Sequence, residues 1–206
     1  MSDAIARAKK IKLLLFDVDG VFTDGTIWLF PAPAGAEQHP EKAKHDGASG
    51  YGIVSASMME AKGFSAHDGI GISLARLGGI RTGIITKRIS ETVALRARDL
   101  KLEFVRQGVL NKIEAFNEIL AEAKLTAEQA AYMGDDIIDL PVMQAAGLAI
   151  AVPNAREEAK RAAHYVTERA GGYGAARDAI EFILRAQGLL ERVVAAYVAG
   201  KRAVGK

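Results

Sequence analysis

Two pairs of acidic residues each follow a short apolar run that is typical of a buried strand. Asp17 and Asp19 follow the first such run, and Asp135 and Asp136 follow a later one. The carboxyl ends of parallel strands meet at one edge of an open α/β sheet, where such sheets bind ligands. Carboxylates that share a crevice repel one another unless a cation neutralises them, and hard oxygen ligands suit Mg²⁺. The spacing therefore predicts a divalent-cation site at this edge.

A hydroxyl and an ammonium group occupy comparable positions in the pattern. Thr86 ends a third predicted strand, and Lys112 opens a helix that follows a fourth. Together with backbone N–H groups at a helix N-terminus, they would form an anion site beside the cation site. Each residue also has an ordinary interpretation, because Asp and Gly form turns and Asp139 could simply cap a helix. Their shared position at strand ends favours a functional site.

The elements that would position these residues alternate between strands and helices. Apolar, β-branched runs predict buried strands at 12–16, 81–85, 130–133 and 148–152, and weaker patterns predict two more strands at 103–105 and 165–167. Segments of helical period predict helices at 70–77, 90–100, 112–123, 139–146, 156–163, 175–187 and 189–198. This alternation predicts an α/β fold in which a Rossmann-like parallel sheet carries helices on both faces. Ser90 could cap one helix, and Thr126 with Gln129 forms a capping-box pattern.

One region, at about 25–67, interrupts the alternation. An apolar strand at 26–30, a loop and a returning segment near 62–66 predict a β-hairpin that projects from the sheet. Its tip, at about 31–57, is unusually long for a hairpin connection.

The apolar residues and histidines of this excursion allow two further expectations. Residues 27–30 are too apolar to face water on an isolated ribbon, so they need a partner surface. His39, His45 and His67 lie in the same region, but their spacing matches no common metal-ligand pattern. Solvated loop histidines are therefore the favoured interpretation.

Length and composition limit the classes of protein. The 206 residues suffice for one well-buried core, so we expect a single domain over 1–206. The 27 Lys and Arg residues offset 25 Asp and Glu residues without a long basic run, which argues against a nucleic-acid partner. With no cysteine, the chain can form neither a disulfide nor a Cys-ligated zinc site. The apolar stretches are too short to span a membrane, so we expect a cytoplasmic protein without a membrane partner.

The order of the motifs resembles that of the haloacid dehalogenase-like phosphohydrolases: Asp-x-Asp-Gly, a strand-terminal Thr, a Lys, and then Gly-Asp-Asp-x-x-Asp. Most of the chain is similar to the small-capped branch that contains the 3-deoxy-D-manno-octulosonate (KDO) 8-phosphate phosphatases. The shared motif text lies at 17–20, 68–69, 107–108, 111–112, 132–136, 141–143 and 170–172.

This resemblance implies a role for each residue of the predicted site. Asp17 would attack phosphorus and form an aspartyl-phosphate, while Asp19 would protonate the leaving alkoxide and then deprotonate the hydrolytic water. Thr86 and Lys112 would hold the phosphoryl oxygens. Mg²⁺ would be bound by Asp17, the carbonyl of Asp19 and Asp135, with Asp136 in support. The family also implies a homotetramer in which the projecting hairpin acts as a minimal cap.

The resemblance also implies a substrate, a small sugar-acid phosphate. Arg88 and Arg96 match an arginine pair of the KDO branch, and guanidinium groups suit a sugar-acid carboxylate. The family loop that contacts the sugar corresponds to Ser65, Ala66, His67, Asp68 and Gly69. The expected activity is therefore Mg²⁺-dependent hydrolysis of KDO 8-phosphate to KDO and phosphate.

Three departures from the family keep other activities open. Lys87 replaces a usual glycine, while Ser73 and Tyr173 each replace an arginine. A phosphatase for sialic-acid-type 9-phosphates or for general small phosphomonoesters is therefore the alternative. A phospho-receiver signalling domain also uses Asp, Thr and Lys around Mg²⁺, but chain length and the second acidic cluster count against it. Turnover of a small phosphoester would separate an enzyme from a receiver.

Overall fold

The computed structural model describes residues 2–31 and 58–200. The predicted tip of the hairpin lies, except for Pro31, outside the described residues, and so do His39 and His45.

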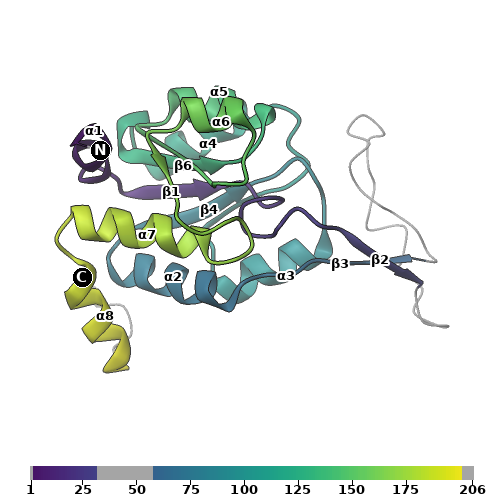
Figure 1. The fold of residues 1–206 in the computed structure, drawn as a ribbon, viewed down its shortest axis with the longest axis horizontal. Coiled ribbons are helices and arrows are strands. Elements are labelled where there is room, and N and C mark those ends of the chain that lie inside the picture. Colours follow the sequence, from purple (N-terminus) through teal and green to yellow (C-terminus); the bar gives the residue numbers. More distant parts are fainter. Residues whose placement is uncertain (1, 32–57, 201–206) are drawn as a thin grey trace.

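A six-stranded parallel sheet forms the centre of the molecule (Figure 1). Its order is β5-β4-β1-β6-β7-β8, and every neighbouring pair is parallel. The strands are β1 (Leu13–Phe16), β4 (Arg81–Ile85), β5 (Phe104–Arg106), β6 (Ala130–Gly134), β7 (Leu148–Ala151) and β8 (Tyr165–Val166). The continuous apolar runs of β1, β6 and β7 are buried throughout because helices cover both faces. The predicted α/β fold is confirmed.

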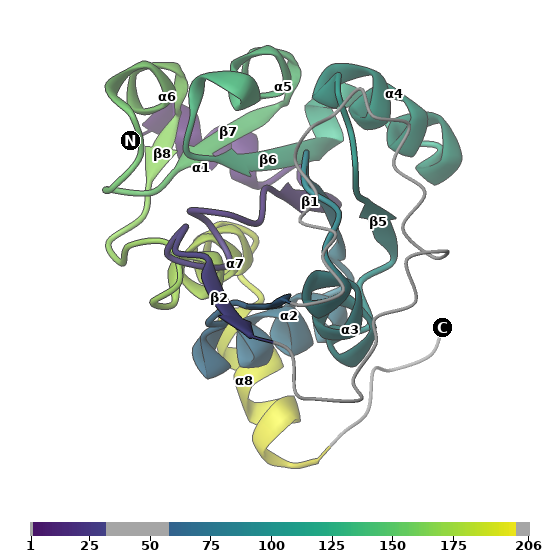
Figure 2. The same cartoon turned by 90° about the vertical axis from the view of Figure 1, so that its right-hand side faces the viewer.

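Helices pack on the two faces of the sheet (Figures 1 and 2). One face carries α4 (Lys112–Ala123), α5 (Leu140–Ala145) and α6 (Glu157–Ala162), and the other carries α2 (Ala66–Leu77), α3 (Glu91–Leu100) and α7 (Ala175–Ala186). Helix α8 (Leu190–Val198) packs against α2 and α7. Helix α1 (Ser2–Ala8) packs against α7. It was not predicted, because so short a helix is not stable by itself and depends on this packing.

Local capping signals act as the sequence predicts. Ser90 caps α3, and its Oγ accepts the Val93 backbone N–H at 3.3 Å. Thr126 and Gln129 form the capping box of a single 3₁₀ turn, Ala127–Gln129, before β6. A second 3₁₀ turn, Ile137–Asp139, leads into α5, so this helix begins one residue later than predicted.

The strand order creates a crevice beside β1. From β1 the chain builds β4 and β5 on one side of the sheet, and only then returns to place β6, β7 and β8 on the other. Ligands bind at such switch points, outside the carboxyl ends of the strands. The register aligns Phe16 of β1 with Ile84 of β4 and with Met133 of β6, so the residues that follow these strands lie side by side.

A two-stranded antiparallel hairpin projects from the carboxyl edge of the sheet (Figure 1). It pairs β2 (Trp28–Pro31) with β3 (Met58–Ala61). The prediction of a returning strand near 62–66 was wrong: β3 ends at Ala61, Lys62 turns inward, and Ser65 caps α2. Within the described part of the chain, no helix is long and apolar enough to cross a membrane.

Candidate active site

Asp17 lies directly after β1, and both of its carboxylate oxygens have partners. Its backbone N–H donates to the Met133 carbonyl at 2.9 Å, which continues the β1–β6 ladder and fixes the start of the loop. The Val18 N–H donates to Asp17 Oδ1 at 2.7 Å, and Lys112 Nζ lies 2.9 Å from Asp17 Oδ2. The side chain is almost completely buried. The sheet therefore holds one carboxylate against one ammonium at the switch point.

Asp139 organises the other side of this crevice. Its Oδ1 lies 2.6 Å from Lys112 Nζ and accepts the Tyr132 hydroxyl hydrogen at 2.7 Å. Its Oδ2 accepts the backbone N–H groups of Asp135 and Asp136 at 3.0 and 3.2 Å. Asp139 thus orients both Lys112 and the acidic loop, which is the segment with Asp135 and Asp136. Asp139 was not among the predicted site residues, although it stands in the Gly-Asp-Asp-x-x-Asp motif.

Three carboxylates lie close enough to share a metal ion. Asp17, Asp135 and Asp139 each offer an oxygen, and these atoms lie within 4.8 Å of one another. Asp135 Oδ1 is buried and has no hydrogen-bond partner among the residues that the structure describes. Lys112 balances one of the three negative charges, and a divalent cation would balance the other two. The donor set therefore fits Mg²⁺.

The proton affinities of the cluster are consistent with a bound cation. Burial, reinforced by the charge of Asp139, raises the pKa of Asp17 to about 7, although Lys112 opposes the shift. Burial and the charges of Asp17 and Asp139 raise the pKa of Asp135 to about 8. Burial alone would lower the pKa of Lys112, but the two neighbouring carboxylates outweigh it and raise that pKa. The lysine therefore stays charged, and a cation would favour ionised aspartates.

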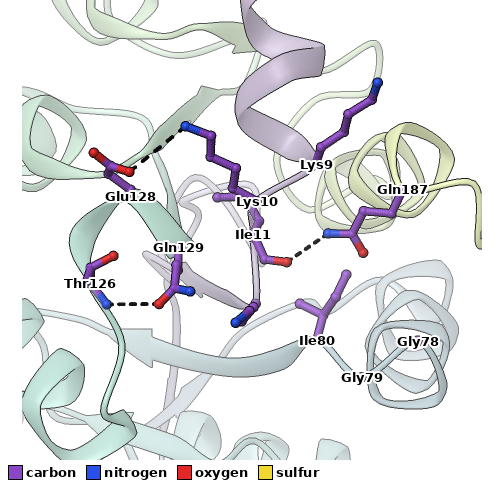
Figure 3. A pocket seen from close by; sticks show the side chains of 11 residues that line it. Lys9, Lys10, Ile11, Gly78, Gly79, Ile80, Thr126, Glu128, Gln129 and Gln187 are labelled. Atoms are coloured by element: carbon purple, nitrogen blue, oxygen red, sulfur yellow. Dashed lines mark hydrogen bonds and ion pairs between the residues drawn. The ribbon is translucent and has the colours of Figure 1, made fainter.

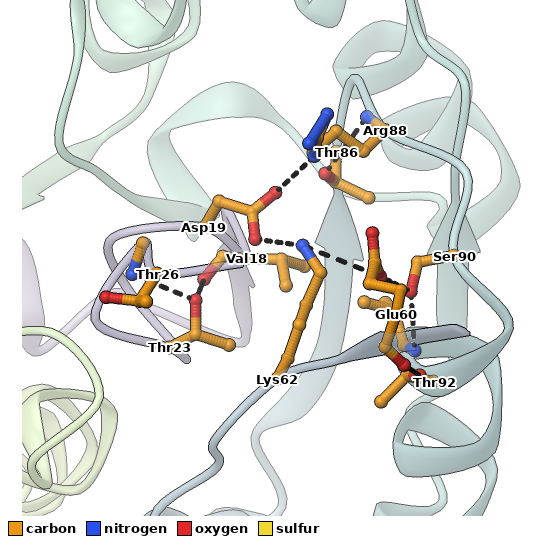
Figure 4. Close-up of polar contacts among 12 residues, drawn as sticks. Val18, Asp19, Thr23, Thr26, Glu60, Lys62, Thr86, Arg88, Ser90 and Thr92 are labelled. Carbon is orange, nitrogen blue, oxygen red and sulfur yellow. Dashed lines mark hydrogen bonds and ion pairs between the residues drawn. The ribbon is translucent and has the colours of Figure 1, made fainter. Parts of the chain in front are cut away.

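Two predicted metal residues occupy different positions from this trio. Asp136 is exposed, and its Oδ1 accepts the Ile137 N–H at 2.7 Å at the start of the 3₁₀ turn. The Asp19 side chain points toward Lys62 and Arg88 (Figure 4). Asp19 was predicted to bind the metal through its backbone carbonyl oxygen, and this contact stays a prediction.

Thr86 and Arg88 follow β4 at the same edge. Thr86 is buried, and its backbone N–H donates to the Arg106 carbonyl at 2.9 Å. Its Oγ1 accepts the Arg88 N–H at 3.4 Å, which forms a tight turn after the strand. Arg88 Nε lies 3.5 Å from Asp19 Oδ2 (Figure 4). The structure thus brings a hydroxyl and a guanidinium to the crevice beside Asp19.

Glycines let the surrounding loops pack closely. Gly20 has a φ of +92°, and a Cβ on it would collide with the Asp135 carboxylate. Gly171 lies against the Gly20 carbonyl, with no room for a Cβ, while its N–H donates to Asn154 Oδ1 at 3.0 Å. The Gly172 N–H donates to the Val21 carbonyl, also at 3.0 Å. The 170–172 motif therefore supports the loop that carries Asp17 and Asp19.

The predicted sugar-contacting segment has structural partners at both ends. Ser65 Oγ caps α2 by accepting the His67 N–H at 3.2 Å. Asp68 Oδ1 accepts the Arg177 N–H at 2.9 Å and so caps α7, whose own N-cap, Gly174, has no side chain to do so. Burial raises the pKa of Asp68 to about 6.

The remaining members of that prediction lie at the surface or beneath the segment. Ala66 and His67 are exposed, and Gly69 lies against the Arg96 guanidinium. Arg96 donates to the Ser65 carbonyl at 3.3 Å and pairs with Asp99 at 2.7 Å, so it is tied to the protein itself. Contact of these residues with a substrate stays a prediction.

A cavity of about 540 Å³ lies at the opposite edge of the sheet (Figure 3). Its lining includes Lys9, Lys10, Gly79 and Gln187. It includes none of the three clustered aspartates, Asp17, Asp135 and Asp139. The residues predicted to carry the chemistry therefore lie at the carboxyl edge of the sheet and not around this cavity.

Comparisons with known proteins agree with this geometry. Residues 82–177 match the model of the haloacid dehalogenase-like hydrolases. The chain is 37% identical to the KDO 8-phosphate phosphatase KdsC of Escherichia coli strain K12, over 92% of this chain and 88% of the relative. It is 38% identical to KdsC of Yersinia pestis, over 92% and 88%.

The structural comparison gives the same family. The crystal structure of the KDO 8-phosphate phosphatase from Moraxella catarrhalis has a TM-score of 0.80 and 31% identity, and covers 96% of this chain and 99% of that one. That structure contains a magnesium ion, a phosphate ion and a KDO molecule. The chain belongs to the KDO 8-phosphate phosphatase family.

The three expected departures from the family lie at different places in the structure. Lys87 is half-buried in the turn between Thr86 and Arg88. Ser73 Oγ donates to the Gly69 carbonyl at 3.2 Å inside α2, and Tyr173 is 64% exposed.

Proposed function

We propose that this protein hydrolyses KDO 8-phosphate to KDO and inorganic phosphate with Mg²⁺ as cofactor. The observation that carries the proposal is the buried Asp17 carboxylate, held against Lys112 beside Asp135 at the switch point of the sheet. The similarity to KDO 8-phosphate phosphatases over nearly the whole chain supports the substrate.

The proposed reaction has two steps. An Asp17 oxygen attacks phosphorus while the bond from phosphorus to the sugar oxygen breaks, and Asp19 donates its proton to the leaving oxygen. Water then attacks the aspartyl-phosphate and passes a proton to Asp19, which releases phosphate and restores Asp17. The separate surroundings of Asp17 and Asp19 support this division of roles.

Positioning and charge stabilisation come from residues at the strand ends. Lys112 and the Thr86 hydroxyl would hold phosphoryl oxygens in line with Asp17. Asp17, Asp135 and the Asp19 carbonyl would hold Mg²⁺, which would supply positive charge against the phosphoryl oxygens so that the anionic Asp17 could approach. Asp139 keeps Lys112 and the acidic loop in place through its four contacts.

Arg88 supports a sugar acid as the substrate. Its guanidinium reaches the crevice within 3.5 Å of Asp19, where a carboxylate on the leaving group could pair with it. We also propose that the protein is a homotetramer. On β2, Trp28, Leu29 and Phe30 are 58%, 45% and 47% exposed in the single chain, and neighbouring hairpins would cover them.

A phosphate-release panel with purified protein tests the activity. KDO 8-phosphate, a sialic-acid 9-phosphate and glucose 6-phosphate are compared with Mg²⁺ and with a chelator. We expect the highest kcat/KM for KDO 8-phosphate and loss of turnover on chelation. Preference for the hexose phosphate would overturn the sugar-acid assignment, and preference for the nine-carbon acid would select the alternative substrate.

A matched variant tests the nucleophile in the same panel. Asp17→Asn removes the attacking charge and a metal ligand but keeps the shape of the side chain, so turnover should almost disappear while the circular dichroism spectrum is unchanged. Substantial residual turnover would contradict covalent catalysis by Asp17.

A further inference from the structure

Lys62 is a buried lysine in the segment that joins the hairpin to α2. It directly follows β3, and its side chain is 0% exposed. A buried ammonium is costly unless it is paired, and the pairing here is specific. Lys62 Nζ forms an ion pair with Asp19 Oδ1 and lies 4.0 Å from Glu60 Oε1 (Figure 4).

Asp19 is thereby held from two sides. Its Oδ1 pairs with Lys62, which comes from the hairpin, and its Oδ2 lies 3.5 Å from Arg88, which follows β4. Two cations on separate elements restrict the torsion angles of this short side chain at the rim of the crevice. Proton transfer depends on such placement, because the carboxylate must stay within hydrogen-bond reach of the oxygen that it serves.

The segment that carries Lys62 is itself held in place by hydrogen bonds to α3. The Ser90 hydroxyl donates to Glu60 Oε1 at 2.5 Å, and the Thr92 hydroxyl donates to the Glu60 carbonyl at 3.3 Å. Strand β3 is therefore fixed to the first turn of α3, and the anchor lies only two residues before Lys62. Figure 4 shows this chain of contacts running from α3 through Glu60 and Lys62 to Asp19.

We propose that Lys62 is a positioning residue that fixes the Asp19 carboxylate for proton transfer to the leaving oxygen and from the hydrolytic water. The inference rests on the proposed function, in which Asp19 is the acid and base. The lysine exchanges no proton in this role, and it acts on the phosphoryl group only through Asp19. The hairpin thus contributes to the reaction from within its own subunit, apart from any role in assembly.

The leaving group distinguishes this role from a merely structural one. Expulsion of an aliphatic alkoxide needs the proton from Asp19, whereas p-nitrophenolate leaves as a stable anion. With Lys62→Met, we expect kcat for KDO 8-phosphate to fall about 10- to 100-fold with KM nearly unchanged. The first-turnover burst of nitrophenol from p-nitrophenyl phosphate should change less than about threefold, because it reports only the step in which protonation matters little.

Controls are available within the chain. Lys62→Arg keeps the cation and should recover part of the loss, whereas Lys10→Met, at a side chain that is 64% exposed at the opposite edge of the sheet, should change neither rate. In an Asp19→Asn background, Lys62→Met should cause no further loss with KDO 8-phosphate. If circular dichroism shows that Lys62→Met does not fold, Lys62→Gln, which keeps a neutral donor, replaces it in every comparison.

Equal losses for the two leaving groups, or additive losses in the Asp19→Asn background, would overturn the positioning role. Failure of the proposed function has a different signature, because wild-type protein would then leave KDO 8-phosphate intact and prefer another aliphatic phosphate. That phosphate would take the place of KDO 8-phosphate in the same comparison, so the test of Lys62 does not depend on the natural substrate.

Discussion

The Asp139 carboxylate lies 2.6 Å from the Lys112 ammonium, and both side chains are almost completely excluded from water. Because Asp139 also accepts the Tyr132 hydroxyl and two backbone N–H groups of the acidic loop, it joins β6, α4 and the predicted metal ligands in one unit. The geometry of the crevice therefore depends on a residue that we do not expect to react.

Asp139→Asn should weaken catalysis without removing a reacting group. The amide cannot balance the charge of Lys112, so we expect kcat/KM or Mg²⁺ affinity to fall about 10- to 100-fold, as for other residues that orient metal ligands. Steady-state kinetics over a Mg²⁺ titration measures both quantities. Asp3→Asn, at a side chain that is 69% exposed, is the control, and equal effects of the two variants would contradict the role of Asp139.

Removal of the metal should make stability depend on pH in a defined direction. In the metal-free protein the pKa values of Asp17 and Asp135 are raised from 3.8 to about 7 and about 8. The folded state then binds protons more tightly than the unfolded state, so this contribution is fully present below about pH 3.8, declines as the pH rises, and is gone above about 7 to 8. With a chelator, the melting temperature should therefore fall as the pH rises from about 4 to about 8.

Added Mg²⁺ should reverse that loss, because it binds the ionised carboxylates. At about 100 times its dissociation constant, a bound ion stabilises the folded state by about 2.7 kcal/mol, or about 5–10 °C in a chain of this size. Protons compete with the cation, so the shift should be larger at pH 8.5 than at pH 6. A shift of the same size at both pH values would contradict metal binding by these carboxylates.

Gly171→Ala should disturb the catalytic loop from outside it. A Cβ at this position has no room against the Gly20 carbonyl, so we expect a loss of about 1–3 kcal/mol in stability together with reduced turnover. Denaturant titration and phosphate release measure the two effects. Gly63→Ala is the matched control, since a Cβ there would meet nothing within 4 Å.

Polar substitutions on β2 should weaken the proposed tetramer. Trp28→Ser combined with Phe30→Ser removes two exposed aromatic rings from the hairpin, so the assembly should dissociate at protein concentrations where the wild type stays tetrameric. Light scattering during size-exclusion chromatography reports the mass. Val198→Ser, at an 80% exposed residue of α8, should leave the mass unchanged, and a monomeric wild type would contradict the proposal.

Much of this molecule could be predicted from local patterns. Strand β4 and helix α4 have the predicted bounds, because a buried strand is short and rich in β-branched residues and an amphipathic helix needs the 3.6-residue period. The placement of Asp17, Thr86 and Asp135 together also followed from sequence, since parallel strands deliver the residues that follow them to one edge.

Other relationships were decided only by tertiary structure. Asp68 caps a helix that begins more than a hundred residues later, and Lys62 forms an ion pair with an aspartate that lies 43 positions away. Neither residue stands in a local pattern that names its partner. The sequence by itself determined which residues end the strands, because periodicity and turn chemistry act over a few neighbours. Which side chains hold those residues in place was decided by packing between distant segments, because such contacts exist only once the chain has folded.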